Sequence, residues 1–253
     1  LSPGRYTDDM AMMLCIARSI VEKGCFDAGD VATRFLEWFD GDPVGIGRTT
    51  WLALSEMKRG ASWLEASENA HRVLGGLSAG NGSIMRCAPI GLLDFRHEDR
   101  LIRDSIESSI ITHWDPQARW GAVALNLAVA LILLGQKCDM MKAVREKVQQ
   151  PDVVRAVSEV EKWRSIDFEP SAYVLDTLQA ALWCFLNTSS FEEALITAVN
   201  LGGDTDTVGA VCGALAGAEY GHEAIPVRWR DLLQDAEEIK RLAGQIYELA
   251  VPA

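Results

Sequence analysis

Two short acidic motifs stand where helices are predicted to begin. They are Thr7-Asp8-Asp9 and Gly202-Gly203-Asp204-Thr205-Asp206-Thr207. Taken singly, each is typical of helix capping, because Thr and Asp oxygens accept hydrogen bonds from free backbone amides and carboxylates favour the positive end of the helix dipole. Together the motifs hold four carboxylates and three threonine hydroxyls, which is more than capping requires.

Four carboxylates gathered at one place repel one another unless cations lie between them. Two divalent cations would balance the four charges. Oxygen ligands without His or Cys favour hard ions such as Mg²⁺, Mn²⁺ or Ca²⁺ over zinc. The motifs therefore predict a metal centre, provided that the fold brings them together.

Glycines flank an asparagine in Gly80-Asn81-Gly82-Ser83, which leads into Met85 and Arg86. Such a loop exposes several backbone amides at a helix start, an arrangement that binds phosphate or ribose oxygens. Asn-Gly is also a common turn, so the loop alone is weak support for a binding site. Two roles stay open for Arg86, pairing with a phosphate or bracing the loop.

His113 lies in the polar segment Thr112-His113-Trp114-Asp115-Pro116. Asp115-Pro116 is typical of a helix start, with aspartate as cap and proline in the first turn. A histidine in this position is more often structural than catalytic. Ligand contacts nevertheless concentrate in such loops, which keeps His113 a candidate.

The elements that must position these residues are predicted to be helices, since apolar residues recur at i, i+3 and i+4 and strict alternation is scarce. No flexible linker interrupts the pattern, which indicates a single domain. The segment 116–134 is apolar almost all round, as in a helix through the middle of a bundle. The predicted helices run over residues 8–23, 28–38, 49–59, 101–109, 116–134, 140–149, 153–163, 173–186, 191–199, 207–220 and 226–249.

Composition narrows the class of protein. The 253 residues carry a formal net charge of −12, which argues against a nucleic-acid binder that neutralises phosphates. The six cysteines fall singly among mostly apolar residues, as expected of thiols in a reducing compartment. The longest apolar run is shorter than the roughly 20 residues that a membrane span needs. A cytoplasmic protein without a membrane span is predicted, in an oligomeric state that the residues leave open.

In their order along the chain, Thr7-Asp8-Asp9, residues 80–86, Thr112-His113 and residues 202–207 resemble the ADP-ribosylglycohydrolase family. The likeness covers nearly the whole chain. It implies an all-α, single-domain orthogonal multi-helix bundle over residues 1–253, with a dinuclear Mg²⁺ or Mn²⁺ centre in a cleft. Relatives normally carry a further segment ahead of this start, so the resemblance also implies a domain that lacks this N-terminal segment.

The resemblance assigns roles residue by residue. The metal ligands that it implies are Thr7, Asp8, Asp9, Asp204, Asp206 and Thr207. The catalytic residues are Asp8, Asp9 and Asp206. The residues expected to bind substrate are Gly80, Asn81, Gly82, Ser83, Met85, Arg86 and His113.

The implied activity is hydrolysis of an N- or O-glycosidic bond of ADP-ribose by a water activated at the dinuclear centre. The implied partner is an ADP-ribosylated protein, with arginine as the first expected acceptor, or a serine adduct or small ADP-ribose conjugate. No residue is identified as the acid for the leaving group. Gly45 stands where some relatives have an aspartate that helps to activate the water, which weakens the expectation of arginine. The alternative function is a non-catalytic ADP-ribose-binding module that has lost turnover.

Overall fold

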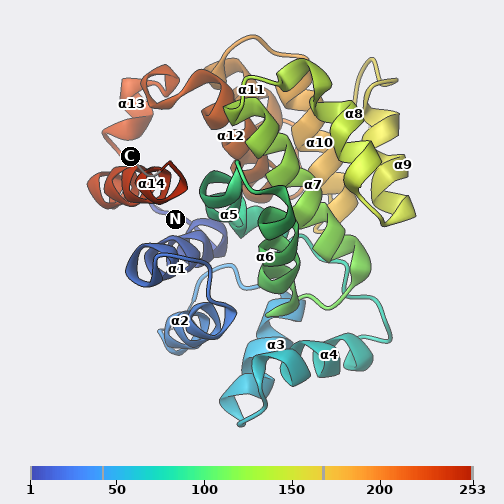
Figure 1. The fold of residues 1–253 in the computed structure, drawn as a ribbon, viewed down its shortest axis with the longest axis vertical. Helices are drawn as coiled ribbons and strands as arrows, with labels where there is room; N and C mark the ends of the chain where they lie inside the picture. Colours follow the sequence, from blue (N-terminus) through green and yellow to red (C-terminus); the bar gives the residue numbers. More distant parts are fainter. Residues whose placement is uncertain (1, 42, 167–168, 252–253) are drawn as a thin grey trace.

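The chain is built from α-helices in the computed structural model, which describes residues 2–41, 43–166 and 169–251. Within these ranges no strand forms, and Gly80 and Tyr173 make an isolated antiparallel bridge. The helices (Figure 1) are α1 Asp8–Lys23, α2 Ala28–Asp40, α3 Arg48–Lys58, α4 Trp63–Val73, α5 Ala88–Asp94, α6 Glu98–Ile110, α7 Pro116–Leu133, α8 Met140–Lys147, α9 Pro151–Val160, α10 Val174–Leu186, α11 Phe191–Val199, α12 Thr205–Tyr220, α13 Val227–Arg230 and α14 Ala236–Ala250. Three 3-10 turns lie between them, η1 Ile84–Arg86, η2 Lys137–Asp139 and η3 His222–Ala224.

Helix α7 runs through the middle of the assembly, as its sequence predicts. It contacts α5, α6, α8, α9, α10 and α12, and most of its side chains are buried. It is also the one described helix that is long and apolar enough to cross a membrane, but 67% of that stretch is buried inside the protein. A buried core helix has the same composition, so this finding is weak evidence for a membrane span.

Two clusters of buried apolar side chains hold the helices together. The larger one surrounds α7, α10 and α12, and the smaller one joins α1 and α2 to α3, α5 and α14. Burying one Leu, Ile or Phe side chain stabilises a fold by about 1.5–3 kcal/mol. The starts of α1 and α12 are therefore anchored, each by a well-packed helix body.

Several predicted helix bounds are wrong. The helix expected over residues 226–249 is two helices, α13 and α14, separated by a turn in which Asp235 adopts a left-handed conformation with φ 58°. Helices α4 and α5 were not predicted at all. The bounds of α1 and α11 are as predicted, and the all-helical fold class is confirmed.

Candidate active site

The first acidic motif forms the start of α1, but the side chain of its N-cap residue does not cap the helix. Thr7 is the N-cap residue and makes no side-chain cap hydrogen bond. Its hydroxyl instead donates to Asp9 Oδ2 at 2.9 Å. Asp8 and Asp9 are both buried, at 7% and 5% exposure. Capping by Thr7 therefore does not explain why two carboxylates are buried here.

The second acidic motif begins α12 in the same manner, since its N-cap residue Asp204 makes no side-chain cap hydrogen bond either. Gly203 sets the turn ahead of it, with φ +65°. A Cβ at this position would lie 2.2 Å from the carbonyl oxygen of Pro170, so only glycine fits. The Asp204 amide donates to that same oxygen at 2.9 Å, which fixes the helix start against Pro170.

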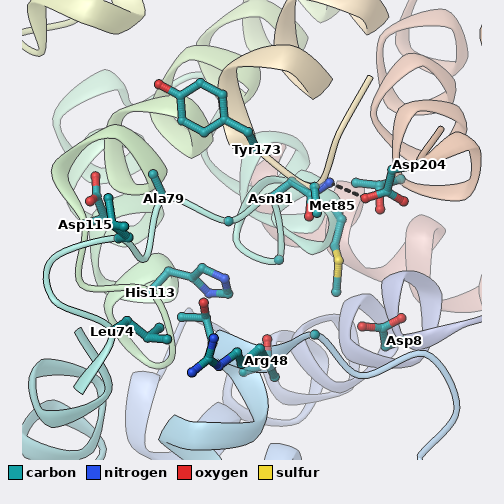
Figure 2. Close-up of a pocket in the computed structure, with 18 of the residues that line it drawn as sticks. Asp8, Arg48, Leu74, Ala79, Asn81, Met85, His113, Asp115, Tyr173 and Asp204 are labelled. Atoms are coloured by element: carbon teal, nitrogen blue, oxygen red, sulfur yellow. Dashed lines mark hydrogen bonds between the residues drawn. The ribbon is translucent and has the colours of Figure 1, made fainter. Parts of the chain in front are cut away.

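The two motifs, almost 200 residues apart in the sequence, open into one cleft of about 810 Å³. Asp8, Asp9, Asp204 and Asp206 all line it. Figure 2 shows Asp8 and Asp204 among the lining side chains. Burial, and then the neighbouring Asp9 charge, raise the pKa of Asp8 to about 7. The pKa of Asp9 is raised to about 6 by burial and by Asp206. This end of the cleft thus gathers acidic groups whose charges repel one another.

The glycine-asparagine loop forms the wall beside the carboxylates. Asn81 Nδ2 donates to Asp204 Oδ2 at 2.7 Å and to Thr177 Oγ1 at 2.9 Å. The Asn81 amide donates to the Ala172 carbonyl at 3.0 Å. Asn81 therefore ties the loop both to the second acidic motif and to the segment that precedes α10.

His113 lies on the same wall, with its ring pressed against the loop glycines. It is 2% exposed and lines the cleft. A Cβ on Gly82 would lie 2.6 Å from the ring carbon Cε1, and one on Gly80 would lie 3.2 Å from Nε2. Both loop glycines therefore make room for the imidazole. Burial, and then the Arg86 charge, lower the pKa of His113 to about 3, so the ring is neutral at neutral pH.

Most of the predicted site residues meet in the cleft, but Thr7, Ser83 and Arg86 do not line it. Ser83 is 1% exposed and its hydroxyl donates to the Ala118 carbonyl at 3.1 Å. Arg86 is 0% exposed and lies behind the cleft wall. Packing against neighbouring helices therefore buries both side chains, and of the two roles left open for Arg86, bracing the loop agrees with this position. The predicted residues that line the cleft are Asp8, Asp9, Gly80, Asn81, Gly82, Met85, His113, Asp204, Asp206 and Thr207.

Comparison with known proteins identifies the family of this chain. The sequence profile of the ADP-ribosylglycohydrolase family matches residues 1–252. The chain belongs to this family. ADP-ribosylarginine hydrolase Tri1 of Serratia proteamaculans (strain 568) is 34% identical over 99% of this chain and 69% of that protein. ADP-ribosyl-[dinitrogen reductase] glycohydrolase of Rhodospirillum rubrum is also 34% identical, over 99% of this chain and 81% of its own length.

A solved structure described as an ADP-ribosylglycohydrolase-related protein complex matches the fold with a TM-score of 0.85 at 36% identity. The match covers 99% of this chain and 84% of that one. The predicted membership of the ADP-ribosylglycohydrolase family is confirmed, and with it the prediction that the chain is a glycohydrolase.

This glycohydrolase also has cleft residues that the sequence did not single out. Arg48 begins α3 and is exposed at the cleft, and no described residue forms an ion pair with it. Gln117 and Tyr173 line the cleft too, and the Tyr173 hydroxyl donates to Gln117 Oε1 at 2.6 Å. A lone arginine or tyrosine carries no motif, so only the fold could identify these residues.

The acidic end of the glycohydrolase cleft has the donor chemistry of a hard-cation site. Asp9 Oδ1 is buried and has no hydrogen-bond partner among the described residues. Oxygen ligands of this kind suit Mg²⁺ or Mn²⁺. Within the described residues, no three His, Cys, Asp or Glu side chains are gathered closely enough to hold one ion.

Proposed function

We propose that this glycohydrolase removes ADP-ribose from a modified protein side chain, with arginine as the first expected acceptor. The observation that carries the proposal is the convergence of two remote acidic helix starts on one cleft beside Asn81 and His113. The names of two relatives, an ADP-ribosylarginine hydrolase and an ADP-ribosyl-[dinitrogen reductase] glycohydrolase, support the substrate class. None of these names supports a non-catalytic module.

The layout of the cleft suits the parts of an ADP-ribose in order. Figure 2 shows Asp8 and Asp204 at one end, Asp115 at the other, and Arg48 and His113 between them. The ribose next to the cleaved bond would lie at the acidic end. Arg48 would then face the diphosphate, because an unpaired guanidinium is a strong partner for phosphate oxygens.

The acidic motifs would hold two divalent cations, with the four aspartates and the hydroxyls of Thr7 and Thr207 as ligands. When bound there, Mg²⁺ or Mn²⁺ supplies Lewis-acid polarisation and lowers the pKa of a water. The protein's own part is to place the sugar. Positive charge develops on the ribose as the glycosidic bond breaks, and the carboxylates of Asp8, Asp9 and Asp206 stabilise that charge.

The segment around Gly45 bears on which acceptor is cleaved. Gly45 has φ +91° and lies against Asp8, so that a Cβ there would be 2.6 Å from Asp8 Oδ1. The cleft accordingly has no side chain at this point beside Asp8, where some relatives have an aspartate. Because the absence of that aspartate weakens the expectation of arginine, serine adducts and small ADP-ribose conjugates are tested together with arginine adducts.

The proposal is tested by release of ADP-ribose from proteins modified on arginine or on serine, and from a small conjugate. We expect release in Mg²⁺ or Mn²⁺, loss of release with a chelator, and at least a hundredfold lower rate for Asp206→Ala. Asp231→Ala removes an exposed carboxylate outside the cleft and is the matched control. Release that survives the chelator would contradict the metal centre. Binding of ADP-ribose without turnover on any substrate would favour the non-catalytic module.

A further inference from the structure

Arg86 is a buried cation that forms no ion pair with a carboxylate among the described residues, although the charge of Asp8 acts on it from a distance. It is 0% exposed, and its described hydrogen-bond acceptors are Met12 Sδ at 3.6 Å, the Ser108 carbonyl at 3.1 Å and Thr112 Oγ1 at 2.7 Å. The guanidinium also lies over the Phe35 ring at 4.7 Å. Burying a guanidinium that no carboxylate contacts directly costs several kcal/mol. Packing alone therefore does not explain an arginine here.

The contact with Thr112 leads from Arg86 to the cleft. Thr112 is itself 0% exposed, and its Oγ1 lies 2.8 Å from His113 Nδ1. The other ring nitrogen of His113, Nε2, lies on the cleft side, next to the loop glycines Gly80 and Gly82. Arg86, Thr112 and His113 thus form one hydrogen-bonded chain that starts in the core and ends at the ligand cleft.

The protons in this chain can be placed by counting donors. A guanidinium only donates, so Thr112 Oγ1 accepts from Arg86. The Thr112 hydroxyl proton then needs an acceptor, and within the described residues that acceptor is His113 Nδ1. A neutral imidazole that accepts at Nδ1 carries its proton on Nε2. The ring therefore presents an N–H group to the cleft.

We propose that Arg86 is a positioning residue, which acts through Thr112 to hold His113 in the tautomer whose Nε2–H donates to an oxygen of the bound substrate. The proposal rests on the proposed function for the identity of that substrate, ADP-ribose. The acceptor is a phosphate or ribose oxygen, since these are the groups opposite the middle of the cleft. The other tautomer would turn a lone pair toward an oxygen and repel it.

The tautomer is measured directly by long-range ¹H–¹⁵N correlation spectra of the histidine side chains in the unliganded protein. The chain has four histidines, and His113→Gln assigns the signal of His113 by its loss. We expect the wild-type His113 to show a protonated Nε2 and an unprotonated Nδ1. A ring with its proton on Nδ1 overturns the proposal.

Two pairs of variants test the relay. Arg86→Met removes the donors and Thr112→Val removes the hydroxyl, so both are expected to give mixed tautomers and about tenfold weaker ADP-ribose binding by calorimetry. Arg86→Lys and Thr112→Ser keep a donor and a hydroxyl, and are expected to restore the wild-type tautomer. Ser105→Ala deletes a buried hydroxyl of α6 that bonds to Asn126 instead, and is the control for a general packing loss.

Failure of the positioning role and failure of the proposed function give different results. If Arg86→Met does not fold, the wild-type spectrum and the variants Thr112→Val and Thr112→Ser decide whether the tautomer is set through Thr112. If Arg86→Met and Thr112→Val keep both the tautomer and the affinity, Arg86 has no positioning role. A wild-type protein that binds no ADP-ribose would defeat the proposed function, while the spectra still report whether Arg86 sets the ring.

Discussion

Replacing Asn81 with aspartate tests whether the acidic motifs are held together under charge repulsion. The Asn81→Asp change is nearly isosteric, but it turns the 2.7 Å contact with Asp204 Oδ2 from a hydrogen bond into a contact between like charges. Losing a hydrogen bond to a carboxylate costs about 1.5–3 kcal/mol. Two charges about 4 Å apart repel by about 4 kcal/mol at an effective dielectric constant of 20. Since relaxation and proton uptake relieve part of this, we expect the free energy of unfolding to fall by about 3 kcal/mol.

The assay is urea unfolding near neutral pH, first with a chelator and then with excess Mg²⁺. A cation bound between carboxylates offsets their repulsion, so Mg²⁺ should stabilise Asn81→Asp more than it stabilises the wild type. Asn126→Asp is the control, because Asn126 is also buried but donates to Ser105 Oγ, away from the cleft. It should lose stability without any gain from Mg²⁺. An Asn81→Asp protein as stable as wild type, or equal recovery of both variants in Mg²⁺, would refute the reasoning.

Three further predictions concern single positions. Gly203→Ala should lower the free energy of unfolding by about 2–4 kcal/mol in chemical denaturation, because its Cβ would lie 2.2 Å from the Pro170 carbonyl oxygen. An unchanged denaturation midpoint would contradict this prediction. Arg48→Ala should weaken ADP-ribose binding about tenfold in calorimetry and reduce its salt dependence, whereas unchanged affinity would remove Arg48 from the diphosphate site. The pKa of His113 falls from 6.5 to about 3 on folding. Between pH 6.5 and pH 3 the unfolded chain therefore carries a proton on this histidine that the folded protein does not, so the free energy of unfolding falls by up to about 1.4 kcal/mol for each pH unit of acidification. Above pH 6.5 the histidine causes no such loss. His113→Gln should flatten this slope in pH-dependent unfolding.

Helical periodicity was sufficient to predict the all-helical fold and the central place of α7. It was not sufficient for the last helix, where a single left-handed residue, Asp235, divides a continuous apolar pattern into two helices. Helix α4 was missed although its capping box, formed by Ser62 and Glu65, is visible in the sequence. Its length equals that of α3, which was predicted, so the capping box is the local signal that could have found it.

The residues of the candidate site were predicted best where they form motifs. Asp8, Asn81 and Asp206 stand in local patterns, and all three line the cleft. Arg86 belongs to such a pattern as well, yet its side chain points into the core. Periodicity along the chain does not report which way a residue of a 3-10 turn faces, because that direction is set by helices packed from elsewhere in the sequence.

The segment from Pro170 to Val174 makes backbone hydrogen bonds both to the second acidic motif and to the glycine-asparagine loop. The Pro170 carbonyl accepts from the Asp204 amide, while the Ala172 carbonyl and the Val174 amide pair with Asn81 and Ala79. Insertion or deletion of one residue here would shift the loop and the second acidic motif relative to each other. This short segment should accordingly be kept at constant length in any engineered variant of this glycohydrolase.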